Sequence, residues 1–259
     1  MSNVVERRRD GAIETVILNR PDKMNALNLP VWQALADMFA AITADDTVRC
    51  VILRGAGDQA VAPGADITEF ETLRANAAQA EAYDTVMRKA LALVADCPHP
   101  TIAQIYGPCV GGGLELAAQC DLRLSAASGK FGVPVGKISV VMGQPEIAGI
   151  MRLAGAARAL EILLEARVFG AEEALAMNLI HRILPDAELE AEVQATAKRI
   201  TANAPLVNRW HKAFVRRMQD ATPLTQAEMH QAYDFLTTED YQEGMAAFAE
   251  KRRPQFKGR

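Results

Sequence analysis

The sequence has few cysteines, and its apolar residues never gather into one long run. Its four cysteines, Cys50, Cys97, Cys109 and Cys120, form no C-x-x-C pair, which indicates reduced thiols rather than a disulfide framework. No apolar stretch reaches the ~18 residues of a membrane-spanning helix. Residues 2–10 are polar and lack the apolar segment of a signal peptide. We therefore expect a soluble, cytoplasmic protein that does not bind a membrane.

The sequence also lacks an excess of basic charge. Its 28 Lys and Arg against 32 Asp and Glu give a formal net charge of −4, which provides no field for a nucleic acid, so we expect no nucleic-acid partner. Half of the 259 residues are hydrophobic and 23% are charged, so an intrinsically disordered chain is excluded. A chain of this length can bury a large core, as one long domain or as a domain with an appendage.

Several common catalytic signatures are absent as well. The glycines after residue 106 are not followed by Lys and then Ser or Thr, as a P-loop requires, and no G-x-G-x-x-G closes the preceding run. The sequence has no G-x-S-x-G nucleophile elbow. The four histidines, His99, His181, His211 and His230, are scattered and form no metal-ligand pattern. We therefore expect neither a metal site nor a serine nucleophile.

What is present is the pattern of an α/β protein. Runs rich in apolar and β-branched residues predict strands, and helical spacing of Ala and Leu predicts helices. The predicted strands cover 12–18, 49–54, 101–106 and 122–125, and the predicted helices cover 29–44, 77–94 and 114–120. The strand–helix–strand order at the start predicts parallel pairing, and periodicity by itself supports stacked parallel strands.

The last quarter of the chain reads differently. From residue 187 the pattern is almost entirely helical, with breaks at Pro205, Pro223 and Pro254. We predict a core over residues 1–197 and a helical C-terminal region over residues 198–259.

Two glycine-containing segments stand out as places where backbone can approach a ligand, because glycine has no Cβ. They are Pro63–Ile67 and Gly107–Leu116. The second runs directly into a helix-forming sequence, so its free N–H groups lie at the positive end of a helix dipole. A carboxylate, Glu115, follows immediately. The two segments together are suited to stabilising negative charge on an oxygen atom.

These segments, with four others, resemble the crotonase (enoyl-CoA hydratase/isomerase) superfamily. In chain order the similar segments are Arg20–Asn28, Pro63–Ile67, Gly107–Leu116, Cys120–Arg123, Phe131–Pro134 and Glu239–Arg252. The resemblance covers essentially the whole chain. It implies a crotonase-like ββα spiral core and an acyl-CoA substrate, with no cofactor other than the coenzyme A of that substrate. It also implies a homotrimer or a dimer of trimers in which the C-terminal region completes the site.

The resemblance also assigns roles to individual residues. The N–H groups of Ala65 and Gly112 would form an oxyanion hole for a thioester enolate, and Glu115 would be the general base. A helix-stabilising role is the alternative for Glu115. The residues expected to contact coenzyme A or the substrate are Ala26, Gly64, Asp66, Ile67, Gly111 and Lys251. For Asp66 a turn-fixing hydrogen bond is the favoured role, and Lys251 could instead be one charge in a solvated run.

One position departs from the family pattern. Hydratases of the family carry a second Glu directly after F-G-x-P, and here that residue is Val135. Glu146 lies near a position where some of the family's isomerases carry an acidic residue, although Pro145 and Glu146 also fit the first two positions of a helix. A 2-enoyl-CoA hydratase is the favoured hypothesis. An enoyl-CoA isomerase, an acyl-CoA hydrolase or decarboxylase, and a non-catalytic binder of acyl-CoA or RNA are the alternatives.

Overall fold

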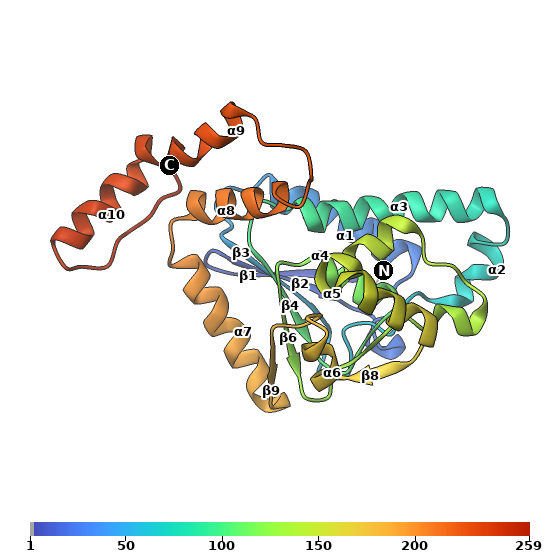
Figure 1. Ribbon diagram of the computed structural model, residues 1–259. Coiled ribbons are helices and arrows are strands. Elements are labelled where there is room, and N and C mark those ends of the chain that lie inside the picture. The colour runs from blue at the N-terminus through green and yellow to red at the C-terminus, as the bar shows by residue number, and fades with distance from the viewer. Residues whose placement is uncertain (1–2) are drawn as a thin grey trace.

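The computed structural model describes residues 3–259, and its strands form two sheets (Figure 1). The larger sheet, in spatial order, contains β1 (Val5–Asp10), β2 (Ile13–Leu18), β3 (Cys50–Gly55), β4 (Thr101–Ile105), β6 (Leu122–Ala126) and β9 (Arg182–Leu184). The smaller contains β5 (Pro108–Val110), β7 (Lys130–Gly132) and β8 (Val168–Gly170). The pairs from β2 to β9 in the larger sheet are parallel, as are β5 and β7.

Helices cover both faces of the larger sheet. In chain order, the helices of residues 3–259 are α1 (Leu29–Thr43), α2 (Phe70–Leu73), α3 (Ala77–Asp96), α4 (Gly112–Gln119), α5 (Gln144–Glu165), α6 (Ala171–Ala176), α7 (Asp186–Thr201), α8 (Pro205–Arg217), α9 (Gln226–His230) and α10 (Glu239–Ala249). Short 3₁₀ turns lie at Pro21–Lys23, Ile67–Glu69, Pro134–Ile138 and Gln231–Thr237. Alternate residues of each central strand point to opposite faces. Val51 and Leu53 therefore join the main core with α1, α3 and α4, while Cys50 and Ile52 pack against α7.

The chain advances through the core in similar turns. β4 of the larger sheet leads to β5 of the smaller sheet and then to α4, and β6 leads in the same way to β7 and α5. β3 leads to a single bridge between Ala62 and Cys109, in line with the smaller sheet, and then to α3. The repeated ββα arrangement that the family resemblance implied is therefore present, although the sequence carries no visible repeat.

The strands and helices predicted in the first half of the chain are confirmed to within a few residues, but some strands were missed. The parallel pairing predicted for the central strands is confirmed. β1 and β2 pair antiparallel, as do β7 and β8, and the prediction included neither pair. β1 was missed because an edge strand needs few apolar residues, and only Val5 in it is buried. The turn residues Asp10 and Gly11, with Gly11 at φ 57°, are the signal that could have revealed the hairpin.

The C-terminal region begins on the core and then leaves it. α7 contains the predicted boundary at residue 197 and packs on the sheet. α8 follows and is attached to the core by Lys212, whose ammonium group contacts the Asp121 carboxylate at 2.7 Å and donates to the carbonyl oxygen of His99. α9 and α10 then project from the body of the molecule (Figure 1). The division into two domains stays a prediction.

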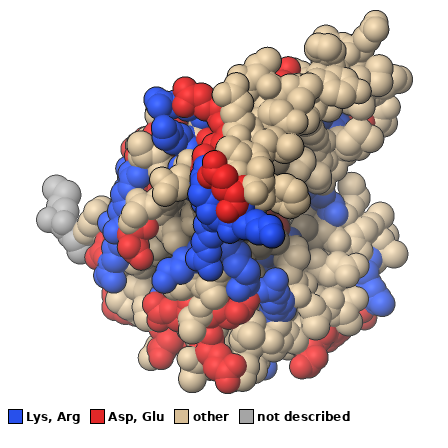
Figure 2. Space-filling model, turned by 90° about the vertical axis from the view of Figure 1, so that its left-hand side faces the viewer, with Lys and Arg blue, Asp and Glu red and all other residues tan. Residues whose placement is uncertain are grey.

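The surface carries both signs of charge in close proximity. Figure 2, which views the molecule from the left-hand side of Figure 1, shows Lys and Arg side chains lying next to Asp and Glu side chains. This mixture agrees with the small net charge of the sequence. Among the helices of residues 3–259, none combines the length and apolar character needed to cross a membrane.

Candidate active site

The first donor segment is the loop around Ala65. Leu27 holds it on both sides, because the Leu27 N–H donates to the Gly64 carbonyl at 2.9 Å and the Asp66 N–H donates to the Leu27 carbonyl at 2.8 Å. Gly64 has φ 121°, a conformation that residues with a Cβ rarely adopt. The intervening Ala65 N–H donates to no other group within residues 3–259. The loop thus leaves one backbone donor free.

The side chains of the Arg20–Asn28 segment support this loop. The Arg20 guanidinium donates to the Ala26 carbonyl at 2.6 Å and to the Asp66 carboxylate at 2.8 Å. Asp66 also accepts hydrogen bonds from the hydroxyl and N–H of Thr68, and the Thr68 and Arg20 contacts lower the pKa of Asp66. The turn-fixing role predicted for Asp66 is therefore present, and Arg20 and Thr68 join it.

The second donor segment is the start of α4. Gly111 has φ 52°, and its N–H donates to the Gly132 carbonyl at 2.9 Å. The first intrahelical bond runs from the Glu115 N–H to the Gly111 carbonyl, so the Gly112 N–H lies before the hydrogen-bonded ladder. Within residues 3–259 it has no acceptor. The helix begins two residues earlier than predicted, which places Gly112 inside its first turn.

The two free donors share one small space. A Cβ built on Gly112 would lie 3.8 Å from the Ala65 nitrogen, and one built on Gly64 would lie 3.9 Å from the Gly112 nitrogen. The oxyanion-hole geometry that the sequence suggested is therefore possible, because both N–H groups adjoin the same cavity.

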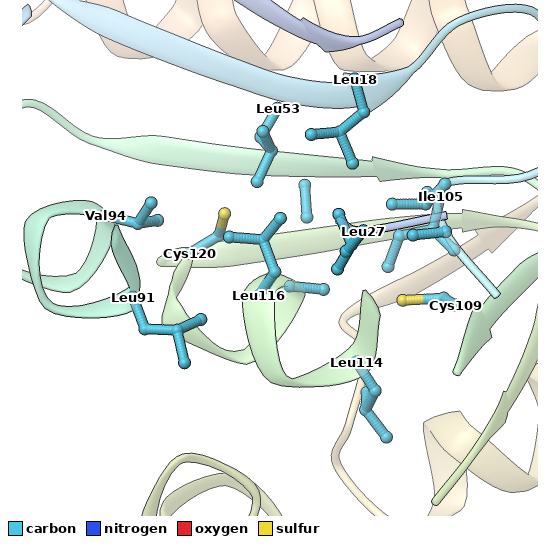
Figure 3. Packing of buried hydrophobic residues seen from close by; sticks show 14 of the residues in the cluster. Leu18, Leu27, Leu53, Leu91, Val94, Ile105, Cys109, Leu114, Leu116 and Cys120 are labelled. Carbon is cyan, nitrogen blue, oxygen red and sulfur yellow. The ribbon is translucent and has the colours of Figure 1, made fainter. Parts of the chain in front are cut away.

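Packing of α4 against the larger sheet fixes this arrangement. Figure 3 shows Leu116 pointing from α4 toward Leu53 and Leu18 of the sheet, with Leu27 alongside. Each of these side chains is at most 1% exposed, and residues 113–119 of α4 are all buried. Burying a large apolar side chain contributes roughly 1.5–3 kcal/mol. The helix that carries the second donor is therefore held rigidly against the sheet that precedes it.

A cavity of about 380 Å³ opens in front of the two donors. Its apolar walls include Trp32, Phe70, Tyr83, Met87, Val135, Val140 and Met142. Gly64, Ala65, Ile67, Gly111, Gly112, Glu115 and Glu146 also line it, so most of the predicted site residues meet here. Val141 and Ile138 lie on this lining with 86% and 55% of their surfaces exposed.

Glu115 places a carboxyl group in this apolar environment. Only 7% of the residue is exposed, and the Gln119 side chain donates to its backbone carbonyl rather than to its carboxylate. Burial, followed by repulsion from Glu146, raises the pKa of Glu115 to about 7. Desolvation penalises the charged form of a carboxyl group, so this group exchanges a proton near neutral pH. A perturbed carboxyl group in a cavity is typical of an acid–base catalyst.

Glu146 reaches the same cavity from the third position of α5, one position later in the helix than predicted, because α5 begins at Gln144. It is 3% exposed, and its Oε1 accepts a hydrogen bond from the Arg88 guanidinium at 2.7 Å. Its Oε2 is buried and has no partner within residues 3–259. The helix-terminal role and the cavity-lining role considered for Glu146 therefore coexist.

Three predicted contact residues lie outside the cavity lining. Ala26 is 9% exposed and lies behind the first donor loop, where its carbonyl accepts from Arg20. Asp66 faces Arg20 and Thr68. Lys251 is exposed beyond α10, which Figure 1 places on the other side of the molecule from α2. Within one chain the structure thus does not bring Lys251 to the donors.

Sequence reasoning overlooked two cations of the cavity, Arg74 and Lys137. Arg74 contacts the Asp84 carboxylate at 3.0 Å, and its guanidinium lies 4.9 Å from the centre of the Phe70 ring and 5.1 Å from that of the Tyr83 ring. Lys137 is an exposed residue of the 3₁₀ turn that also carries Val135. No local motif marks either residue, because each reaches the cavity through the tertiary fold. Within residues 3–259, no group of three or more His, Cys, Asp or Glu side chains could hold a metal ion.

Comparison with known proteins agrees with this geometry. The family model described as enoyl-CoA hydratase/isomerase matches residues 8–259. The chain belongs to the enoyl-CoA hydratase/isomerase family. A crotonyl-CoA hydratase of Syntrophomonas wolfei is 32% identical over 251 residues, which cover 96% of this chain and 95% of that protein. A probable enoyl-CoA hydratase of Mycobacterium bovis is 34% identical over 252 residues, with the same coverage.

Solved structures give the same assignment of fold. An enoyl-CoA hydratase/carnithine racemase from Magnetospirillum magneticum superposes with a TM-score of 0.98 at 62% identity, covering 100% of this chain and 97% of that one. An enoyl-CoA hydratase from Bacillus anthracis superposes with a TM-score of 0.93 at 30% identity, and the match covers 99% of this chain and 100% of that one. The predicted crotonase fold is therefore confirmed, and the family supports an enzyme that acts on acyl-CoA.

Proposed function

We propose that this family member is a 2-enoyl-CoA hydratase in which one carboxylate, Glu115, performs both proton transfers. The observation that carries the proposal is the position of Glu115 in an apolar cavity beside two free backbone donors, with Val135 in place of the second glutamate. Relatives named as crotonyl-CoA and enoyl-CoA hydratases support the same reaction class.

In this proposal the thioester carbonyl oxygen of the substrate accepts hydrogen bonds from the Ala65 and Gly112 N–H groups. The Glu115 carboxylate takes a proton from water while the water oxygen bonds to C3. The electrons of the C2=C3 double bond move toward the thioester oxygen and form an enolate, which the two donors stabilise. Each such donor typically contributes roughly 3–4 kcal/mol to lowering the barrier. Glu115 then returns its proton to C2, so the net change is addition of water.

A pKa near 7 suits this double role. A base must be ionised to accept the proton from water, and the resulting acid must release it readily to C2, so the most effective pKa lies near the working pH. The raised pKa of Glu115 meets this requirement. The scheme uses no cofactor besides the coenzyme A of the substrate. A cytoplasmic location also stays a prediction.

Double-bond isomerisation is the second candidate, because Glu146 lines the same cavity as Glu115. A carboxylate that removes a proton from C2 of a 3-enoyl-CoA and delivers it to C4 would move the double bond into conjugation without adding water. The same two N–H donors would stabilise the dienolate.

Two single substitutions separate these candidates. For the hydratase we expect Glu115→Gln to lower crotonyl-CoA hydration by ~10²–10⁴-fold, the usual contribution of a general acid–base group. Glu146→Gln should leave the maximum rate within a few-fold. The measurement is loss of the conjugated enoyl-thioester absorbance, with the product identified by mass spectrometry.

The isomerase candidate predicts the reverse order of effects. Glu146→Gln would then cause the larger loss of activity with a 3-enoyl-CoA substrate. The wild type would hydrate crotonyl-CoA at a negligible rate. If both variants keep full activity on every enoyl-CoA tried, neither carboxylate is catalytic and the proposal fails.

A further inference from the structure

We infer that Arg88 is a positioning residue that holds the Glu146 carboxylate in an ion pair and so leaves Glu115 as the member of the carboxylate pair that takes up and releases the proton. The catalytic meaning of this inference rests on the proposed function. Its physical basis is a set of ion pairs that joins Arg88 of α3 to Glu146 of α5 and, through Asp84, to Arg74, which follows α2.

Arg88 contacts Glu146 from outside the cavity. Its Nε lies 2.7 Å from Glu146 Oε1, and its Nη2 lies 3.6 Å from Asp84 Oδ2. Asp84 in turn contacts Arg74 at 3.0 Å, which completes a chain of alternating charges. The Arg88 side chain is 42% exposed and does not line the cavity, whereas Glu146 does. Arg88 can therefore influence a bound substrate only through the carboxylates that it contacts, of which Glu146 is the nearer.

Gly143 leaves the space that this ion pair occupies. A Cβ on Gly143 would lie 2.2 Å from Glu146 Oε2 and 2.8 Å from Arg88 Nη2, both far inside a normal contact. The Glu146 carboxylate thus packs directly against backbone at the start of α5, with Oε1 on the guanidinium. The buried Oε2 has no partner within residues 3–259 and remains free to accept a hydrogen bond in the cavity.

The charges facing Glu115 then explain which carboxylate binds the proton. Glu146 of α5 and Asp84 of α3 repel the ionised form of Glu115, while Arg74 favours it. Two buried carboxyl groups in one cavity cannot both ionise without a compensating cation. The guanidinium of Arg88 lies on Glu146, so Glu115 is the carboxyl group that takes up and releases a proton near neutral pH. Glu115 and Glu146 therefore differ in their charged surroundings, and Arg88, which lies outside the cavity, causes that difference.

The test is Arg88→Gln. Without the guanidinium, the buried Glu146 carboxylate loses its compensating cation and competes with Glu115 for the proton, which weakens the repulsion on Glu115. The pKa of Glu115 should fall, and the acid limb of the kcat profile for crotonyl-CoA hydration should move to lower pH by about one unit, the scale of a nearby-charge effect. KM should stay within a few-fold, because Arg88 does not reach the substrate. Arg88→Lys should restore the wild-type profile.

A second measurement does not depend on activity. In protein labelled with ¹³C at the glutamate carboxyl groups, the Glu115 and Glu146 signals can be assigned by their loss in Glu115→Gln and Glu146→Gln. Their titrations should show the proton moving from Glu115 to Glu146 in Arg88→Gln. The matched control is Arg158→Gln, which removes a surface guanidinium that contacts Glu161 at 2.5 Å. That control should change neither titration.

The outcomes separate the two proposals. A wild type that does not hydrate crotonyl-CoA overturns the proposed function, while the carboxyl titrations still decide the role of Arg88. Unchanged Glu115 titration in Arg88→Gln overturns the positioning role, and so does a loss of rate with an unmoved acid limb, which is the result expected from a merely structural residue.

Discussion

Gly112 provides its N–H from the first position of α4, and this placement allows the donor to be removed without breaking the helix. Proline has no N–H and is well tolerated at the first helical position. Gly112→Pro should therefore lower kcat at least ~100-fold, the effect of losing one oxyanion donor, while coenzyme A binding persists. Turnover of crotonyl-CoA and calorimetric titration with coenzyme A measure the two effects.

Gly112→Ala is the matched control for that substitution. Its added Cβ would lie 3.2 Å from Leu27 Cδ1 and 3.5 Å from Trp32, so it tests bulk at the same point while keeping the N–H. The alanine variant should retain most of the activity that the proline variant loses. Equal losses in both variants would assign the effect to crowding and would contradict the proposed role of Gly112 as an oxyanion donor.

The buried Glu115 carboxyl group should lower the stability of the folded state at alkaline pH. Its pKa is raised from 4.5 to about 7, so the native state binds this proton more tightly than the unfolded chain does. The penalty is absent below the unfolded pKa, grows between the two values and is complete above pH 7. Glu115→Gln should therefore unfold at higher urea than the wild type at about pH 8, by up to about 3 kcal/mol in unfolding free energy, but not at about pH 4.

The control for this pH dependence is Glu172→Gln, a substitution at an exposed position of α6. It should change the unfolding free energy equally at both pH values. If Glu115→Gln gains no stability at the higher pH, the carboxyl group is not desolvated in the way that its burial indicates.

At the scale of elements, the site depends on how closely the start of α4 approaches the first donor loop. A Cβ on Gly113 would lie 2.4 Å from the Ala62 carbonyl oxygen, which already accepts a hydrogen bond from the Val110 N–H. Gly113→Ala must therefore move α4 away from residues 62–65. We expect a loss of about 1–3 kcal/mol in unfolding free energy, as for other overpacked sites, together with reduced turnover.

Urea denaturation and crotonyl-CoA kinetics would measure both consequences of Gly113→Ala. The control is Gly170→Ala, because a Cβ at Gly170 would meet nothing within 4 Å. Wild-type stability and turnover in the Gly113 variant would mean that the two segments can separate without affecting the donors.

At the scale of the whole molecule, the projecting C-terminal region exposes apolar side chains that a single chain leaves uncovered. Phe248 is 84% exposed, Met218 65%, Tyr233 59%, Met245 54% and Met229 53%. Exposed apolar patches of this kind usually mark protein contacts. We keep the prediction of a homotrimer or a dimer of trimers. Lys251 lies in the same region, so its predicted contact with coenzyme A would be made in the cavity of a partner subunit.

Light scattering at micromolar concentration tests this prediction. The wild type should have the mass of three or six chains, and Phe248→Asp should shift it toward the monomer, because a charge would replace a large apolar contact. Phe248→Leu, which keeps the position apolar, should retain the oligomer. A wild type that is monomeric under these conditions would contradict the prediction.

The sequence by itself determined the features that depend on local chemistry. Glycine spacing and the helix-forming run after residue 112 indicated two backbone donors and a nearby carboxylate, because conformational freedom and helix dipoles are local properties. β-Branched runs placed the central strands for the same reason. The sequence did not predict strand β1, because this strand is stabilised by pairing with β2 and its polar composition does not indicate that contact.

Tertiary structure alone decided how the carboxylates differ. Glu115 and Glu146 are separated by 30 residues, and nothing in their local sequences shows that they share a cavity or that Arg88 contacts only one of them. Proton affinity depends on burial and on charges within a few ångströms, and the fold sets both quantities by bringing α3, α4 and α5 together. The sequence could therefore name the acid–base candidates, whereas only their packing decides which of them exchanges a proton near neutral pH.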